Sequence, residues 1–118
     1  MTEYKTYLIT GGTGFIGSHL AEYILENDPN SRVILLSRGN GGTSKESVYY
    51  LFKKYRSRIR FTKVDIRDYD RIRETIRGVD VVFHLAAQPN PDRSIIYPRE
   101  TFEINVTGTI NVLEACLE

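Results

Sequence analysis

The sequence predicts an α/β fold in which a doubly wound parallel sheet carries helices on both faces. Apolar runs of strand length alternate with segments of helical periodicity along the 118 residues. The strand runs are apolar at nearly every position, as expected for strands that are buried on both faces. Each run is followed by a helix, which indicates parallel strands, and right-handed crossovers then give the strand order 3-2-1-4.

The first strand is expected over Tyr7–Thr10, directly before a glycine-rich turn. Apolar side chains then recur at helical spacing over residues 15–25, and Asn27-Asp28-Pro29 ends that helix. Arg32–Leu36 is a near-continuous apolar run and predicts the second strand. The glycine-rich segment Ser37–Ser44 predicts the loop that follows it.

The next helix is expected over residues 48–55, with Ser44 as its N-cap. Ile59–Val64 predicts the third strand. Tyr69–Arg77 predicts a short helix, which ends at Gly78 because glycine readily adopts the left-handed conformation found after helices.

The fourth strand is expected over Val79–Leu85, followed by a loop at Gln88–Asp92 that contains two prolines. A last helix begins at Pro98 or Arg99 and continues to the final residue. Its apolar side chains share one face: Phe102, Val106, Ile110 and Leu113. These segments complete a four-stranded sheet with helices between its strands.

Three glycines, Gly11, Gly14 and Gly17, stand three apart between the first strand and its helix. A strand-to-helix turn needs a residue with positive φ, which suits Gly11. A Cβ at Gly14 would obstruct a dinucleotide pyrophosphate, and Gly17 lets the helix pack closely on its strand. The helix N-terminus offers unpaired N–H donors and partial positive charge to the phosphates. This context predicts a Rossmann-type dinucleotide site.

The choice of dinucleotide depends on the end of the second strand. NAD-binding proteins place an acidic residue there to hold the ribose 2′-OH. Asp28 lies too early for this role, and Ser37 and Arg38 occupy the position instead. A hydroxyl and a guanidinium suit a 2′-phosphate, so the sequence favours NADP over NAD. The alternative is an Arg38 that points to solvent.

Four segments are expected to meet beyond the carboxyl ends of the strands, where the strand order reverses and ligands bind. They are Gly11–Gly17, Ser37-Arg38, Asp65-Ile66 and Leu85–Gln88. Several motifs include or follow them: Thr10-Gly11-Gly12-Thr13-Gly14-Phe15-Ile16-Gly17, Asp65-Ile66-Arg67-Asp68, His84-Leu85-Ala86-Ala87-Gln88-Pro89, Asn105-Val106-Thr107-Gly108-Thr109 and Asn111-Val112-Leu113-Glu114-Ala115. With these motifs the chain resembles the extended short-chain dehydrogenase/reductase family, the NAD-dependent epimerases and dehydratases of nucleotide sugars.

The resemblance implies a set of cofactor-binding residues. They are Gly11, Thr13, Gly14, Phe15, Ile16, Gly17, Ser37, Arg38, Asp65, Ile66, Leu85, Ala86, Ala87 and Gln88. Asp65 would accept a hydrogen bond from the adenine amino group, unless it is merely a solvated carboxylate, and Ile66 would pack on the ring. Leu85–Ala87 would form a wall beside the pyrophosphate and the nicotinamide ribose, and Gln88 would contact cofactor or substrate. His84 and Asn105 would be structural.

The resemblance also implies a catalytic tyrosine with a lysine four residues later, on a helix after a fifth strand. The lysine lowers the pKa of the tyrosine, which can then act as a base. Two pairs, Tyr49 with Lys53 and Tyr50 with Lys54, have this spacing but precede the third strand, so no catalytic residue is assigned. Residues 1–118 are therefore expected to form an incomplete NAD(P)-binding domain that is inactive alone.

The leading function is thus the NAD(P)-binding portion of an enzyme that, at full length, would also bind a nucleotide sugar. The alternative is a non-catalytic dinucleotide-binding or sensor module that uses the same crevice. A basic segment at residues 53–60 raises nucleic-acid binding as a third interpretation, but a net charge of +1 does not favour it. A P-loop is excluded, because no Gly-Lys-Ser/Thr follows the glycines.

Composition also bears on whether the protein contains disulfides, binds metal or contacts a membrane. The single cysteine, Cys116, excludes an internal disulfide and a cysteine-based zinc site, and it is expected to be a small buried apolar side chain. No metal-binding residue is assigned. No apolar stretch approaches 18 residues and no signal peptide is present, which predicts a cytoplasmic chain without membrane contact. An apolar fourth strand without a fifth beside it predicts self-association, as a homodimer or an aggregate.

Overall fold

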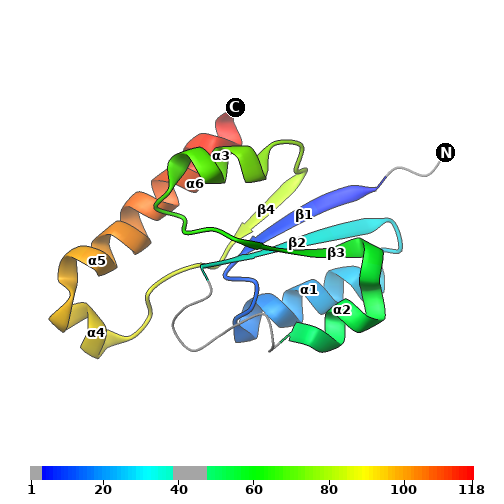
Figure 1. Cartoon of the computed structure of the whole chain (residues 1–118), viewed down its shortest axis with the longest axis horizontal. Coiled ribbons are helices and arrows are strands. Elements are labelled where there is room, and N and C mark those ends of the chain that lie inside the picture. Colours follow the sequence, from blue (N-terminus) through cyan, green and yellow to red (C-terminus); the bar gives the residue numbers. More distant parts are fainter. Residues whose placement is uncertain (1–3, 39–47) are drawn as a thin grey trace.

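A computed structural model describes residues 4–38 and 48–118 (Figure 1). The sheet is parallel and has the order β3-β2-β1-β4, which confirms the predicted topology. The strands are β1 Lys5–Thr10, β2 Ser31–Ser37, β3 Ile59–Lys63 and β4 Val81–His84. The first two strands begin earlier than the sequence predicts, because pairing between Lys5 and Ser31 extends them. The predicted N-cap Ser44 lies outside the described residues.

Helices cover both faces of the sheet, as predicted (Figure 1). α1 Phe15–Asn27 and α2 Tyr49–Tyr55 lie on one face, and a short 3₁₀ turn, η2 Arg56–Arg58, connects α2 to β3. α3 Tyr69–Ile76 and α6 Gly108–Leu117 pack side by side on the other face.

The inner strand β2 shows why two helical layers are required. Its Val33 and Leu35 pack against α1 and α2, whereas Ile34 and Leu36 pack beneath α3 and α6. All four side chains are buried. Full burial of one such side chain is worth about 1.5–3 kcal/mol, so exposing either face of this strand would be costly.

The segment after β4 differs from the predicted loop, because it contains the helix α4 Pro91–Ile96. The Asn90 side chain caps this helix by accepting hydrogen bonds from the backbone N–H groups of Asp92 and Arg93. Asn followed by proline at the first helical position is a typical helix start, so the signal was present in the sequence.

The last helix has the predicted extent but contains an irregularity. It consists of α5 Pro98–Phe102, a π-helical turn η3 Glu103–Thr107, and α6. Along it runs an exposed apolar stripe, which comprises Phe102, Val106, Ile110, Leu113 and Leu117. The prediction that Cys116 is buried is wrong: α6 turns it toward solvent because Val112 and Ala115 occupy the buried face. No helix in the described part of the chain is long and apolar enough to cross a membrane.

Candidate functional site

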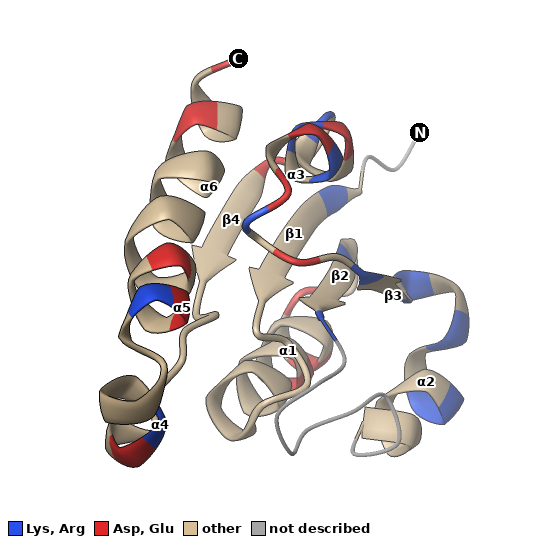
Figure 2. Ribbon diagram, turned by 60° about the vertical axis from the view of Figure 1, so that its left-hand side comes forward, with Lys and Arg blue, Asp and Glu red and all other residues tan. Residues whose placement is uncertain are grey.

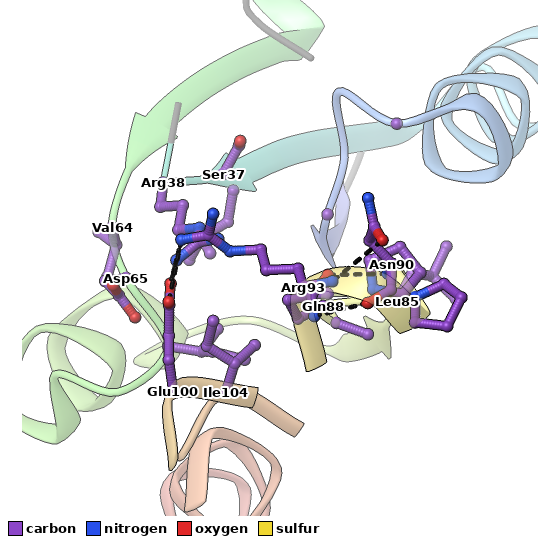
Figure 3. Close-up of a pocket in the computed structure, with 18 residues that line it drawn as sticks. Ser37, Arg38, Val64, Asp65, Leu85, Gln88, Asn90, Arg93, Glu100 and Ile104 are labelled. Carbon is purple, nitrogen blue, oxygen red and sulfur yellow. Dashed lines mark hydrogen bonds and ion pairs between the residues drawn. The ribbon is translucent and has the colours of Figure 1, made fainter. Parts of the chain in front are cut away.

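A cavity of about 1030 Å³ lies beyond the carboxyl ends of the strands, at the place predicted from the strand order (Figure 3). Segments from β1, β2, β3 and the loop after β4 line it, together with residues of α4, α5 and η3. The lining residues are Gly11, Gly14, Leu36, Ser37, Arg38, Val64, Asp65, Ile66, Leu85, Ala86, Ala87, Gln88, Pro89, Asn90, Pro91, Arg93, Glu100 and Ile104.

The glycine turn forms one wall from backbone alone. Gly11 has φ +69°, and a Cβ there would lie 3.0 Å from the backbone nitrogen of Ala86. A Cβ on Gly17 would overlap the carbonyl oxygen of Gly11, which shows how tightly α1 packs on the turn. A Cβ on Gly14 would meet only that same oxygen, at 3.3 Å. The turn therefore needs Gly11 and Gly17 for its own geometry, while Gly14 leaves space on the cavity side.

The N-terminus of α1 begins at this turn. Gly14 is the N-cap residue, and no described side chain caps the helix. The first turn of α1 also contains no acidic residue. The partial positive charge of the helix end is therefore uncompensated, which is the arrangement that binds phosphate groups.

Charged side chains form the opposite wall. The Asp65 carboxylate accepts hydrogen bonds from Arg67, including one of 2.6 Å from Nη2 and one of 2.9 Å from the backbone nitrogen. These bonds hold the pKa of Asp65 below its ordinary value, so the group is ionised at neutral pH. Asp65 lines the cavity, and Arg67 engages both of its carboxylate oxygens.

Glu100 of α5 pairs with arginines on two other elements. Its carboxylate lies 3.6 Å from Nη1 of Arg38, which follows β2, and accepts hydrogen bonds of 3.0 and 2.9 Å from Nη2 of Arg93 on α4. Figure 3 shows Glu100 directed toward Arg38. Hydrogen bonding to Arg93 holds the pKa of Glu100 below its ordinary value. Arg38 therefore faces a carboxylate and not open solvent.

The loop after β4 is held by hydrogen bonds to side chains. Thr10 Oγ1 accepts from the backbone nitrogens of Leu85 and Ala86, at 3.0 and 3.1 Å. The Gln88 side chain donates to the carbonyl oxygen of Asn90 and to Thr101 Oγ1, and accepts from the Asn90 nitrogen. Asn105 bonds both backbone groups of Gln88, which confirms its predicted structural role.

The cavity brings together most of the site residues expected from the sequence. Ser37, Arg38, Asp65 and Ile66 line it, as do Gly11, Gly14 and the segment 85–88. Four expected residues lie outside the lining: Thr13 and Gly17, which are buried in the turn, and Phe15 and Ile16, whose side chains are exposed. The latter two can approach a phosphate only through their backbone N–H groups.

Eight residues of the lining are not among those expected from the sequence: Leu36, Val64, Pro89, Asn90, Pro91, Arg93, Glu100 and Ile104. Arg93 lies between the predicted loop Gln88–Asp92 and the predicted last helix, where the sequence predicts no helix, whereas the structure has α4 there. Glu100 and Ile104 lie on the predicted last helix, but no local pattern indicates which of its faces turns toward the cavity.

The two tyrosine–lysine pairs lie on α2, away from the cavity lining. Partial burial and the nearby carboxylate of Glu22 raise the pKa of Tyr50. A catalytic tyrosine would require the opposite shift. Neither Tyr49 nor Tyr50 lines the cavity.

The basic segment lies along α2, η2 and β3 (Figure 2), and one of its arginines has a structural role. Arg58 donates hydrogen bonds to the carbonyl oxygens of Leu25, Asp28 and Ser31. It therefore fixes the connection between α1 and β2. Within the described residues, no group of three His, Cys, Asp or Glu side chains could hold a metal ion.

The NAD dependent epimerase/dehydratase family matches residues 7–118. The chain belongs to this family. One relative is a UDP-N-acetylglucosamine 4,6-dehydratase (inverting) of Campylobacter jejuni, 32% identical over 118 residues, which are all of this chain and 34% of the relative. Another is a 3beta-hydroxysteroid-dehydrogenase/decarboxylase of Arabidopsis thaliana, 33% identical over 121 aligned positions that cover 100% of this chain and 27% of the relative.

Solved members of the family share the fold. The structure of DesIV, a dTDP-glucose 4,6-dehydratase from Streptomyces venezuelae with NAD bound, superposes with a TM-score of 0.85 at 34% identity. The similarity covers 95% of this chain and 35% of that one. The chain spans about a third of the length of the relatives it matches, and it is homologous to their N-terminal, NAD-binding part.

Proposed function

We propose that the chain binds an adenine dinucleotide in the cavity, with the pyrophosphate at the N-terminus of α1. The observation that carries the proposal is the open backbone at Gly14, where an uncapped helix end meets a cavity of about 1030 Å³. Asp65 and Ile66 would hold the adenine, Ser37 and Arg38 the adjacent ribose, and the 85–88 segment the nicotinamide half.

The test is a fluorescence titration of the purified chain with NADH. Gly14→Val should weaken binding at least tenfold (on the order of 1.4 kcal/mol), because the new side chain occupies the phosphate position. Gly78→Ala is the matched control: Gly78 has φ +82° and lies outside the cavity lining, so alanine strains the fold without touching the site. Equal affinity of wild type and Gly14→Val would place the phosphates elsewhere.

We further propose that NAD is the preferred ligand, which reverses the preference drawn from Ser37 and Arg38 alone. The solved relative binds NAD, and NADP preference finds no support among the relatives described. Glu100 gives a physical reason, because its carboxylate pairs with Arg38 and would repel a 2′-phosphate. The contribution of Arg38 to ribose binding would then be steric and polar, without the charge pairing that favours NADP.

The activity of a longer protein that contains this domain is proposed by analogy with its relatives. Epimerisation or dehydration of a nucleotide sugar is the first candidate, with residues 1–118 forming the cofactor-binding domain and contributing no catalytic residue. The chain alone should therefore show no turnover. Sustained turnover that Tyr49→Phe abolishes would contradict this assignment. A non-catalytic dinucleotide sensor stays the alternative, and a longer gene product that lacks a Tyr-x-x-x-Lys motif after a fifth strand would favour it.

Self-association is proposed on two surfaces. In the described sheet β4 pairs only with β1, so its outer edge offers backbone N–H and C=O groups to another chain. The exposed apolar stripe on α5, η3 and α6 offers a second surface. Sedimentation of the wild type beside Val81→Lys, with circular dichroism as a folding control, tests the strand edge. A folded monomer at high micromolar concentration would contradict self-association through either surface.

A cytoplasmic location of the protein also stays a prediction.

A further inference from the structure

His84, the last residue of β4, lies half-buried between two hydroxyl groups. Its Nδ1 is 2.7 Å from Thr10 Oγ1 on β1, and its Nε2 is 2.9 Å from Thr109 Oγ1 on α6. The ring therefore joins three elements that are distant in sequence. It lies directly before Leu85, where the backbone enters the cavity lining.

The surrounding hydrogen bonds determine which ring nitrogen carries the proton. Thr10 Oγ1 accepts from the backbone nitrogens of Leu85 and Ala86, which occupies both of its lone pairs. Its single O–H must then donate to His84 Nδ1. On the other side, Thr109 Oγ1 donates to the carbonyl oxygen of Asn105 at 2.7 Å, so it accepts from His84 Nε2. One neutral tautomer, protonated on Nε2, satisfies every contact.

The chain of hydrogen bonds continues into the cavity wall. Asn105, whose carbonyl oxygen accepts from Thr109, uses its side chain to accept from the Gln88 nitrogen at 2.7 Å and to donate to the Gln88 carbonyl oxygen. Asn105 lies within the π-helical turn η3. The backbone at Leu85, Ala86 and Gln88 is thus fixed at both ends by one connected network.

We propose that His84 is a positioning residue for dinucleotide binding. As the Nε2–H tautomer it fixes the positions of Thr10 and Thr109 directly, and that of Asn105 through Thr109, and this network fixes the backbone of residues 85–88. His84 does not line the cavity and need not touch the ligand. The nature of the ligand rests on the proposed function, whereas the network itself does not. Burial lowers the pKa of His84, in agreement with a neutral ring.

The first measurement needs no variant. Nitrogen NMR of the imidazole rings in the wild-type chain at neutral pH should show His84 protonated on Nε2. The chain has two histidines, and His19→Gln assigns their signals, because His19 lies on α1 with its Nδ1 against the Phe15 carbonyl oxygen, outside the cavity lining. A charged ring, or a proton on Nδ1, would overturn the proposal.

The second measurement breaks the network at Thr109. Thr109→Val removes the hydroxyl at nearly constant volume and should weaken NADH binding about three- to tenfold, as expected for the loss of one or two hydrogen bonds. The backbone amide signals of Leu85, Ala86 and Gln88 should shift as well. Thr75→Val is the matched control, because Thr75 on α3 also donates to a carbonyl four residues earlier but lies outside the lining.

The outcomes separate this proposal from the proposed function. If the wild type binds no NADH, the proposed function fails, and the amide signals of Thr109→Val still decide whether the network positions the wall. A folded Thr109→Val chain with unchanged amide signals would overturn the positioning role. Should that variant fail to fold by circular dichroism, the wild-type tautomer decides.

Discussion

The two walls of the cavity are built in different ways. The wall at Gly11–Gly17 is made of backbone and the N-terminus of α1, with no titratable group. The opposite wall is made of charged side chains from separate elements, above all Arg38, Asp65 and Glu100. The first wall is rigid because its geometry is set by close backbone contacts. The second can exchange partners when a ligand arrives, since ion pairs at partly exposed sites are weak.

The largest effect is expected at the backbone wall. Gly17→Ala should lower the free energy of unfolding by about 1–3 kcal/mol, because its Cβ would overlap the Gly11 carbonyl oxygen. Urea denaturation measures this. Gly14→Ala serves as the control, since its Cβ would meet the same oxygen at 3.3 Å, and it should cost less than Gly17→Ala. Equal losses would mean that the two glycines play the same role.

The next effect concerns the helix that supplies Arg93 to the charged wall. Asn90→Ala removes the N-cap of α4 and should cost about 1 kcal/mol of stability. Amide hydrogen exchange should increase in α4 and leave the glycine turn unchanged. Faster exchange in both walls would show that they are one cooperative unit and that the contrast between them is false.

A smaller effect is expected on ligand choice. Glu100→Gln removes the carboxylate beside Arg38 and should raise NADP affinity relative to NAD by about threefold, as for a partly exposed ion pair. Arg38→Ala in that background should remove the gain. Glu114→Gln on α6, outside the lining, is the charge-matched control. If Glu100→Gln leaves the ratio unchanged, Glu100 does not select the ligand.

The smallest effect is a pH dependence confined to the charged wall. Because Arg67 lowers the pKa of Asp65 in the folded chain below its ordinary 3.8, ionised Asp65 stabilises the fold above that value. This stability is lost as the pH falls through the lower, folded-state pKa. The difference in unfolding free energy between wild type and Asp65→Asn should therefore shrink on acidification from pH 6 to 3. A constant difference would show that Asp65 contributes nothing through its charge.

The same contrast explains what the sequence could predict. The glycine turn was predictable because positive φ at Gly11 and close packing at Gly17 are local requirements that few other residues meet. Strand order followed from the alternation of buried strands and helices along the chain. The side chains of β2 point alternately into the two cores, which explains why the whole strand is apolar.

The charged wall was only partly predictable. Arg38 and Asp65 were predictable because they lie within two residues of the ends of β2 and β3, and these strand ends share one edge of the sheet. Glu100 was not, because its approach to Arg38 depends on the angle at which α4 and α5 leave β4. The π-helical turn at Glu103–Thr107 was not predictable either, since the apolar spacing of Phe102, Val106, Ile110 and Leu113 fits a continuous helix. Tertiary packing decides these positions.

The central place of β1 in the sheet has a consequence for folding. This strand precedes the other described strands of its sheet in the sequence, and it pairs with β2 on one side and with β4 on the other. The contact between Thr6 and Asp80 joins residues 74 apart in sequence. During synthesis one edge of β1 therefore stays unpaired until β4 has left the ribosome. Such long-range parallel pairing forms slowly. Until it forms, the unpaired apolar edge of β1 is exposed to chaperones and to incorrect pairing with other chains.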